Sequence, residues 1–290
     1  MSAANAGTIP ALLHRFFDDA AIFPPARTDL SRAVAAHVDR RSTELGDIVA
    51  TFVIDDARLP ALADLTAAVT PHLDLAITVT AGPAAVAGAL DIASTLENVV
   101  VRALEIRVPD AMSCETFFAA LDEAPIPGPV AVFVEIPRDE RGDSVITETA
   151  ARGRFGKFRT GGLSASAHPD ENELAAGIIA AVSSGVPFKC TAGLHHAVRN
   201  TDQQHGFEQH GALNVLCATA AAIEAAPVDA VARWLALRDP AAVAEHVAGL
   251  DPRVRSHMLS VGSCSISEPV ADFRELGLLE QAPSMKGEIR

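Results

Sequence analysis

Residues 155–193 read FGKFRTGGLSASAHPDENELAAGIIAAVSSGVPFKCTAG and contain one complete structural repeat. The apolar runs at its two ends, 155–159 and 186–191, are typical of buried β-strands. The Ala-rich segment 171–184 between them has the length of a helix, and it follows an Asp at position 170, a residue type that often begins helices. This stretch therefore predicts a strand, a helix and a second strand parallel to the first.

The same alternation extends toward the N-terminus. Successive strand centres, from the run at 50–54 to the run at 186–191, lie about 24 to 32 residues apart, which is room for a strand, a helix and two short loops. The earlier predicted strands are Phe16–Phe23, Ala50–Ile54, Leu75–Thr80, Val99–Val108 and Val130–Ile136. Helices are expected at Leu59–Thr70, Pro83–Ser94 and Asp110–Glu123, the last with Asp110 as a cap. Seven strands are thus complete by residue 191.

The eighth strand has two candidate positions, 258–261 and 212–217. We favour 258–261, because the apolar residues of Leu213–Ile223 follow helical spacing in an Ala-rich context. Further helices are expected at Val228–Arg238, Ala241–Leu250 and Pro269–Leu279. Eight strand–helix units in 290 residues predict an α/β fold, a TIM (β/α)8 barrel formed by one domain over residues 1–290, with extra helices between strands seven and eight. A doubly wound open sheet is the alternative, although neither GxGxxG nor GxxxxGK[ST] occurs to support nucleotide binding.

The composition limits the classes of partner. Hydrophobic residues make up 49% of the chain and charged residues 21%, which is typical of a folded protein with a sizeable core. The net charge of −14 argues against general binding to nucleic acid or to anionic membrane surfaces. No secretory signal and no apolar run of about 18 residues is visible, and the four scattered cysteines form no CxxC pair. We therefore expect a cytoplasmic protein with reduced thiols.

Ionisable residues lie on the predicted strands, where barrel interiors are normally filled by apolar side chains. Residues two apart in a strand share a face, so Lys157 and Arg159 point the same way. All of these residues fall late in their strands, where a barrel has its active-site mouth. They are Glu105, Arg107, Glu135, Lys157, Arg159 and Lys189. Either they neutralise one another in a buried network, or they form a site; burying several charges is a costly way to stabilise a core.

Two lysines on adjacent strands suggest one chemistry in particular. Strands lie about 4.8 Å apart, so the amines of Lys157 and Lys189 can approach each other. Burial and a neighbouring cation both disfavour an ammonium ion, and we expect a depressed lysine pKa. A neutral amine can attack a carbonyl group to form a Schiff base, and Glu135 or Glu105 can then move protons.

Three motifs in the C-terminal half carry a family resemblance: Lys157-Phe158-Arg159-Thr160-Gly161, Lys189-Cys190-Thr191-Ala192-Gly193 and Gly262-Ser263-Cys264-Ser265. Their order and form are similar to those of the deoxyribose-phosphate aldolases, a class I, Schiff-base family. The resemblance implies that Lys157 is the Schiff-base residue, that Lys189 perturbs it, and that no cofactor is needed. It also implies an anion site formed by Gly193, Gly262, Ser263 and Ser265. The chain departs from the family in Phe158-Arg159, which replaces two small residues, and in a longer stretch between strands seven and eight.

Four of the ten histidines lie in the segment 195–210, which is expected to overhang the barrel mouth. Histidine is a common metal ligand, so an alternative function is a divalent-metal-dependent hydrolase or lyase using His195, His196 and Glu135. The loop could instead cap helices or contact a second copy in a homo-oligomer. Arg107, Arg159 and Arg199 are candidates for holding a carboxylate or phosphate.

The sequence therefore predicts an aldolase-like enzyme acting on a small anionic carbonyl compound. A non-catalytic barrel that binds a small anion is a further alternative. Asp18 and Asp19, near the first strand, either complete the acid/base set or cap a turn.

Overall fold

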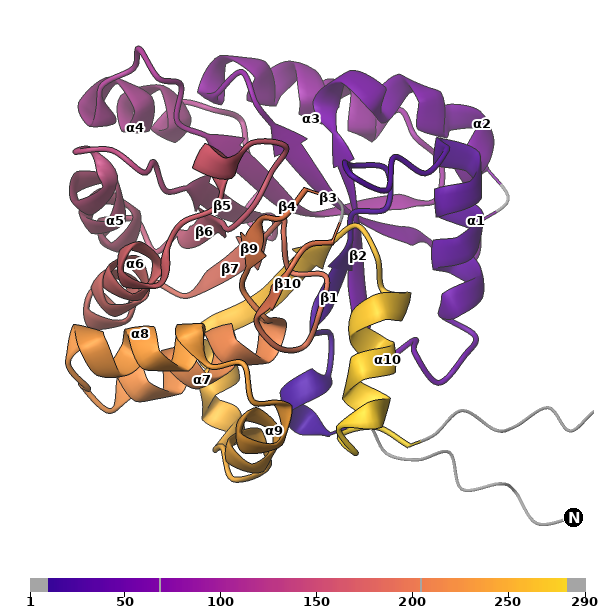
Figure 1. Cartoon of the computed structure of the whole chain (residues 1–290). Coiled ribbons are helices and arrows are strands. Elements are labelled where there is room, and N and C mark those ends of the chain that lie inside the picture. Colours follow the sequence, from indigo (N-terminus) through magenta and orange to yellow (C-terminus); the bar gives the residue numbers. More distant parts are fainter. Residues whose placement is uncertain (1–9, 68, 204, 281–290) are drawn as a thin grey trace, which may run out of the picture.

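A computed structural model describes residues 10–67, 69–203 and 205–280 (Figure 1). Eight parallel strands close into a barrel in the order β1–β10–β7–β6–β5–β4–β3–β2. The barrel strands are β1 (Phe17–Asp19), β2 (Val49–Asp55), β3 (Leu73–Val79), β4 (Val99–Arg107), β5 (Ala131–Glu135), β6 (Phe155–Arg159), β7 (Phe188–Thr191) and β10 (Met258–Ser263). Closure confirms the predicted barrel and excludes the open sheet.

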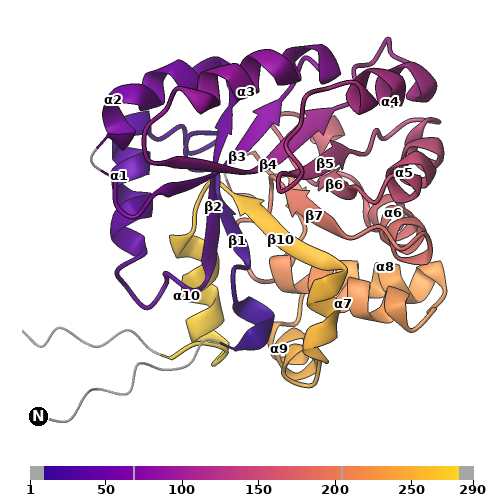
Figure 2. The same ribbon diagram turned by 180° about the vertical axis from the view of Figure 1, so that it is seen from behind.

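Helices surround the strands on the outside, as Figures 1 and 2 show from opposite sides. They are α1 (Leu30–Arg40), α2 (Ala63–Thr66), α3 (Val86–Ser94), α4 (Cys114–Asp122), α5 (Gly142–Ala151), α6 (Glu171–Ser183), α7 (Ala212–Ile223), α8 (Val228–Ala236), α9 (Pro240–Ala248) and α10 (Ser267–Glu275). Short 3-10 helices occur at Ala11–Leu13, Asp56–Leu62, Pro83–Ala85, Ala165–Ala167 and Pro252–Ser256. None of the helices in the described ranges combines the length and apolarity needed to cross a bilayer.

Helix starts follow local capping chemistry. The carboxylate of Asp170 accepts a hydrogen bond from the backbone N–H of Glu173, as expected for α6. The prediction that Asp110 caps the next helix is wrong. Its carboxylate pairs with Arg107 at 2.7 Å, and α4 begins after Ser113, whose hydroxyl caps the helix. The expected helix at 59–70 divides into a 3-10 helix containing Pro60, which lacks an N–H donor, and the short α2.

Three helices, α7 to α9, separate β7 from β10, which confirms the predicted insertion and places the eighth barrel strand at Met258–Ser263. Asn214 on α7 is fully buried; its side-chain amide donates to the carbonyls of Trp234 and Leu237, and its oxygen accepts from the N–H of Arg199. These bonds attach the segment after β7 to the helical insertion. That segment contains a short antiparallel hairpin, β8 (Asn200–Thr201) with β9 (Glu208–Gln209), which the sequence did not predict.

Most apolar side chains pack between the sheet and the helices, in one continuous core. A second, smaller cluster lies inside the barrel and consists of Val53, Ala76, Ala103 and Phe133. The ammonium of Lys189 lies 5.3 Å from the centroid of the Phe133 ring, so charged side chains adjoin this apolar layer directly.

Candidate active site

The register of the strands brings the predicted charges together. Lys157 on β6 is paired with Lys189 on β7 and with Glu135 on β5. Paired residues in adjacent strands point to the same face, so all three side chains enter the barrel interior. Glu105 enters from β4, and Asp18 enters from β1, which closes the barrel beside β10. Side chains from five strands thus meet in one place.

Five of these side chains form a continuous series of ion pairs, which we call the interior charge chain: Asp18, Lys189, Glu105, Lys157 and Glu135. Lys189 Nζ lies 2.6 Å from Asp18 Oδ2 and 2.6 Å from Glu105 Oε1. Lys157 Nζ lies 2.9 Å from Glu105 Oε2 and 3.0 Å from Glu135 Oε2. Carboxylate and ammonium therefore alternate, and one carboxylate, that of Glu105, lies between the two lysines.

Hydrogen bonds from neighbouring strands satisfy Asp18, the first residue of the interior charge chain. The hydroxyl of Ser260 donates to Asp18 Oδ2 at 2.5 Å. Thr51 donates to Asp18 Oδ1 twice, from its hydroxyl at 2.5 Å and from its backbone N–H at 3.2 Å. Buried polar groups with every partner satisfied hold one arrangement. Sequence reasoning missed Ser260 and Thr51, whose only signal is a small polar side chain inside an apolar strand.

The expectation of a depressed lysine pKa is wrong. Burial disfavours the ammonium of Lys157, but the carboxylates of Glu105 and Glu135 outweigh burial and raise its pKa. Asp18 and Glu105 likewise raise the pKa of Lys189 above its ordinary value. Burial alone would raise the pKa of Glu105, yet the two lysines lower it to about 2. The predicted shift assumed that the nearest charge to each lysine is the other lysine. In the folded protein each lysine lies between two carboxylates, which reverses the direction of its pKa shift.

The two lysines differ in access. A cavity of about 1030 Å³ opens at the carboxyl ends of the strands, and its walls include Lys157, Glu105 and Glu135. Lys189 is not among the described residues that line this cavity, which we call the mouth cavity. The side chain of Lys157 is 9% exposed and that of Lys189 is 1% exposed. A molecule in the mouth cavity can therefore reach the amine of Lys157.

The three predicted anion-binding arginines all line the mouth cavity but have different partners. Arg107 pairs with Asp110 at 2.7 Å. Arg199, which is 8% exposed, pairs with Glu171 at 2.6 Å and with Glu208 at 3.3 Å. These two carboxylates connect Arg199 to α6 and to the β8–β9 hairpin, and its role in holding an anion stays a prediction.

Arg159 has no such partner. Its Nε donates to the carbonyl of Gly161 at 3.0 Å, and no carboxylate in the described ranges forms an ion pair with its guanidinium. Arg159 therefore remains a candidate for binding an anion.

The predicted glycine and serine anion site is only partly assembled. Gly193 and Gly262 line the mouth cavity, but Ser263 and Ser265 are not among its described lining residues. The hydroxyl of Ser263 donates to the carbonyl of Ser265 at 2.7 Å, which uses its proton inside the turn. Gly193 has φ +73°, and a Cβ on Gly161 would lie 2.7 Å from the Cα of Gly193. Both glycines thus permit close approach of two loops.

The histidines do not form the alternative metal set. His195 Nδ1 lies 3.4 Å from Glu268, and His196 Nδ1 lies 3.1 Å from Asp272. Neither contacts Glu135, and no group of three His, Cys, Asp or Glu residues within the described part of the chain is arranged to hold a metal ion. These imidazoles instead join the loop after β7 to α10.

A thiol adjoins the first of these pairs. Cys264 Sγ lies 3.7 Å from each ring nitrogen of His195, and burial raises the pKa of this thiol to about 11. It therefore remains protonated at neutral pH, which leaves it a poor nucleophile.

Asp18 and Asp19 have separate roles, because neighbouring residues of a strand face opposite sides. Asp18 joins the interior charge chain, and Asp19 faces α1. There its Oδ2 lies 3.1 Å from His37 Nδ1 and 2.6 Å from Arg40 Nη1. Asp19 and His37 are both buried, so this group fastens β1 to α1.

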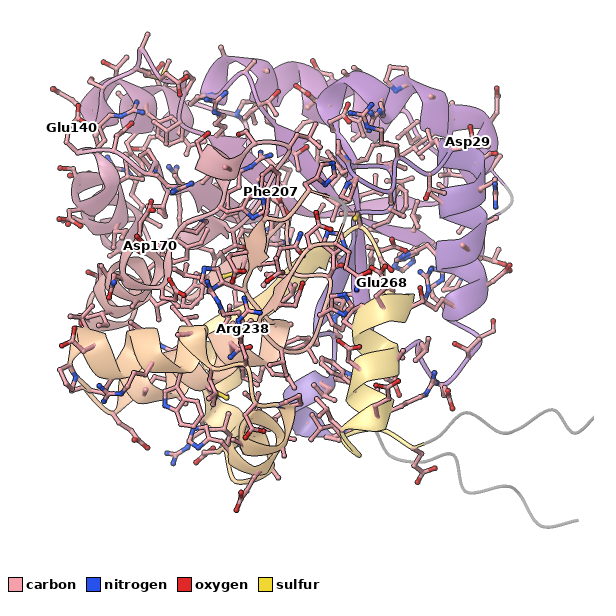
Figure 3. The ribbon with its side chains drawn as sticks, viewed as in Figure 1. Asp29, Glu140, Asp170, Phe207, Arg238 and Glu268 are labelled. Atoms are coloured by element: carbon pink, nitrogen blue, oxygen red, sulfur yellow. The ribbon has the colours of Figure 1, made fainter. Side chains whose placement is uncertain are left out.

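Figure 3 labels three lining residues of the mouth cavity, Phe207, Arg238 and Glu268, near the centre of the view. In Figure 1 the β8–β9 hairpin crosses in front of the barrel strands. Hairpin residues also line the cavity, so the hairpin forms part of its wall.

No protein-family model and no curated protein matches the sequence. Among solved structures, the chain is similar to RipC from Yersinia pestis, with 13% identity, a TM-score of 0.39 and coverage of 81% of this chain and 91% of that one. It is also similar to a protein from Toxoplasma gondii ME49 that is provisionally assigned as a deoxyribose-phosphate aldolase. The second match has 13% identity, a TM-score of 0.40 and coverage of 92% of both chains. The chain's own strand order identifies it as a closed eight-stranded parallel βα barrel.

Proposed function

We propose that this protein is an aldolase-like lyase in which Lys157 forms a Schiff base with a small anionic carbonyl compound. The observation that carries the proposal is the position of Lys157 on the wall of the mouth cavity, with Glu105 and Glu135 within 3.0 Å of its amine. An amine that can reach substrate and two carboxylates that can accept or return protons are the groups required for this chemistry.

The first step needs a neutral amine. As the carbonyl group approaches, the ammonium of Lys157 passes one proton to Glu135, and the freed lone pair attacks the carbonyl carbon. The carbonyl π electrons move to oxygen, which takes one of the two protons of the attacking nitrogen, and a neutral carbinolamine results. Glu135 then returns its proton to the new hydroxyl, which leaves as water while the lone pair of nitrogen forms a carbon–nitrogen double bond. The product is a cationic iminium attached to Lys157.

The iminium accepts electrons from the bond that breaks. A carboxylate of the site removes the proton from a hydroxyl group on the carbon β to the original carbonyl carbon. The bond between the α and β carbons then breaks, its electrons move toward nitrogen, and an aldehyde leaves. The remaining enamine takes a proton on carbon, and water hydrolyses the iminium to free Lys157. The reverse sequence joins the two fragments.

Lys189 has a different task in this scheme. It is buried under Glu105, away from the cavity lining, and its two ion pairs hold it as an ammonium. We assign it as a positioning residue that fixes the carboxylate of Glu105 against Lys157. Glu135 is 16% exposed and is the better placed carboxylate for exchanging protons with substrate.

Borohydride trapping tests the proposal directly. Lysine occurs only at positions 157, 189 and 286, so peptide mapping separates every lysine in the chain. Incubation with acetaldehyde or pyruvate and sodium borohydride is expected to add one reduced adduct to the peptide containing Lys157. Lys157→Gln should abolish the adduct, and Lys286→Gln is the matched control that should retain it.

The wild-type peptide map makes the test independent of how well Lys157→Gln folds. An adduct confined to Lys286, or no adduct with either carbonyl compound, would contradict the proposal. Circular dichroism of each variant shows whether a lost adduct reflects lost structure.

A further inference from the structure

Arg159 lies two residues after Lys157 at the end of β6, so both side chains leave the same face of that strand. Their Cα atoms are therefore about 6.6 Å apart. Both residues line the mouth cavity. The amine of Lys157 and the guanidinium of Arg159 therefore face the same cavity.

The side chain of Arg159 is exposed, and one hydrogen bond orients its guanidinium. Its Nε donates to the carbonyl of Gly161 at 3.0 Å. A Cβ on Gly162 would lie 3.3 Å from its Nη2, so the absence of a side chain there makes room for the guanidinium. A donor group fixed before binding loses less conformational entropy when it meets its ligand.

Four described arginines line the mouth cavity: Arg107, Arg159, Arg199 and Arg238. The first pairs with Asp110, the third with Glu171, and the fourth with Glu208. Arg159 alone among them has no carboxylate partner in the described ranges. Its charge acts on Glu135, whose pKa Lys157 and, less strongly, Arg159 lower against the effect of burial, and no ion pair in the described part of the chain occupies the guanidinium of Arg159.

The part of the cavity wall formed by α10 carries three carboxylates. Glu268, Asp272 and Glu275, all on α10, line it beside the loop where the phosphate site was expected. Glu268 is half exposed, and its charge repels an anionic group approaching that loop. The carboxylates of α10 therefore disfavour an anionic group beside that helix.

We infer that the substrate is a short oxo acid whose carboxylate is held by Arg159 while its carbonyl carbon reacts with Lys157. This inference rests on the proposed function and names the substrate class of the same site. The two side chains start two residues apart on one face of β6, and a ligand whose carboxylate and carbonyl group lie within a few bonds of each other, such as a 2-oxo acid, fits this spacing. A guanidinium forms paired hydrogen bonds with carboxylates and with phosphates, so the choice of probes below separates the two.

The experiment compares three probes in the borohydride assay: pyruvate, uncharged acetaldehyde and dihydroxyacetone phosphate. Arg159→Gln is expected to slow labelling of Lys157 by pyruvate about 10- to 100-fold, the range for losing a charge-assisted hydrogen-bonded pair. Labelling by acetaldehyde should change less than about twofold on the same scale. Arg159→Lys should lie between wild type and Arg159→Gln, because it keeps the charge and loses the fork. Arg238→Gln removes a cavity arginine that already has a partner, and it should keep the preference for pyruvate.

The outcomes separate the two proposals. If acetaldehyde labels Lys157 while Arg159→Gln leaves pyruvate labelling unchanged, the oxo-acid inference is overturned and the Schiff-base proposal stands. If dihydroxyacetone phosphate is the preferred probe, the assignment to carboxylates is likewise overturned. If no probe labels Lys157 in the wild-type protein, the proposed function itself fails.

Discussion

Replacing Lys189 with methionine removes one charge from the middle of the interior charge chain and nearly preserves side-chain volume. Lys189 is 1% exposed and makes two ion pairs of 2.6 Å, with Asp18 and Glu105. Removing one partner of a buried ion pair costs about 3–5 kcal/mol. Asp18 keeps its bonds from Ser260 and Thr51, so we expect the lower end, about 3 kcal/mol less free energy of unfolding at pH 8.

The loss of unfolding free energy in Lys189→Met should become smaller as the pH falls. Without Lys189 the buried carboxylates of Asp18 and Glu105 lose a cation, and their pKa values rise in the folded state. A folded protein that binds protons more readily than the unfolded chain gains stability as the pH falls. We therefore expect the deficit of Lys189→Met relative to wild type to be smaller by about 1 kcal/mol at pH 5 than at pH 8.

Urea unfolding followed by circular dichroism at the two pH values measures both quantities. Asp18→Asn with Lys189→Met is the matched control. It removes a carboxylate together with its cation, and it should recover at least about 1 kcal/mol of the loss. A single-variant deficit below about 1 kcal/mol, or one that is the same at pH 5 and pH 8, would refute the view that the charges stabilise one another.

Three further outcomes are expected. The pKa of Glu105 falls to about 2 on folding, so its ionised form contributes about 3 kcal/mol to the free energy of unfolding. This contribution should disappear as the pH drops from about 5 to about 2, and a free energy from urea unfolding that stays constant over this range would contradict it. Asn214→Ala removes three hydrogen bonds, one of them from the N–H of Arg199, and should lower the free energy of unfolding by about 3 kcal/mol. It should also increase amide hydrogen exchange in residues 198–203. Unchanged exchange would show that Asn214 does not hold this segment. His37→Ala leaves Asp19 less well paired and should lower the free energy of unfolding by about 2 kcal/mol. Because Asp19 faces α1, borohydride labelling of Lys157 in the folded variant should stay unchanged. Lost labelling would contradict the separate roles of Asp18 and Asp19.

The barrel could be predicted because its signals are local. Each strand is a short apolar run, and the spacing between runs repeats along the chain. The hairpin of Asn200–Thr201 with Glu208–Gln209 could not be predicted, since two-residue strands are too short to show a period. Helix α5 (Gly142–Ala151) likewise gives a weak signal, because it begins with glycine and contains several β-branched residues.

The site could be predicted only in part. The rule that alternate residues share a face is enough to bring Lys157 and Arg159 to one side of β6. The sign of the lysine pKa shifts depends on contacts between distant segments, and Lys189 and Asp18 are 171 residues apart. A carboxylate next to a lysine in space has no signature in the sequence around either residue. The number of carboxylates around each lysine amine could therefore be determined only from the folded structure.

In the interior charge chain each ammonium lies between two carboxylates, and those beside Lys157 Nζ belong to Glu105 and Glu135. This pair of carboxylates distinguishes between two successive adducts on the same nitrogen. A carbinolamine is neutral there, whereas the species formed by its dehydration carries a full positive charge. Surroundings of low dielectric constant amplify the difference, so the carboxylates favour expulsion of water and resist its return. The carboxylates of Glu105 and Glu135 would thereby stabilise a cation that is covalently attached to Lys157.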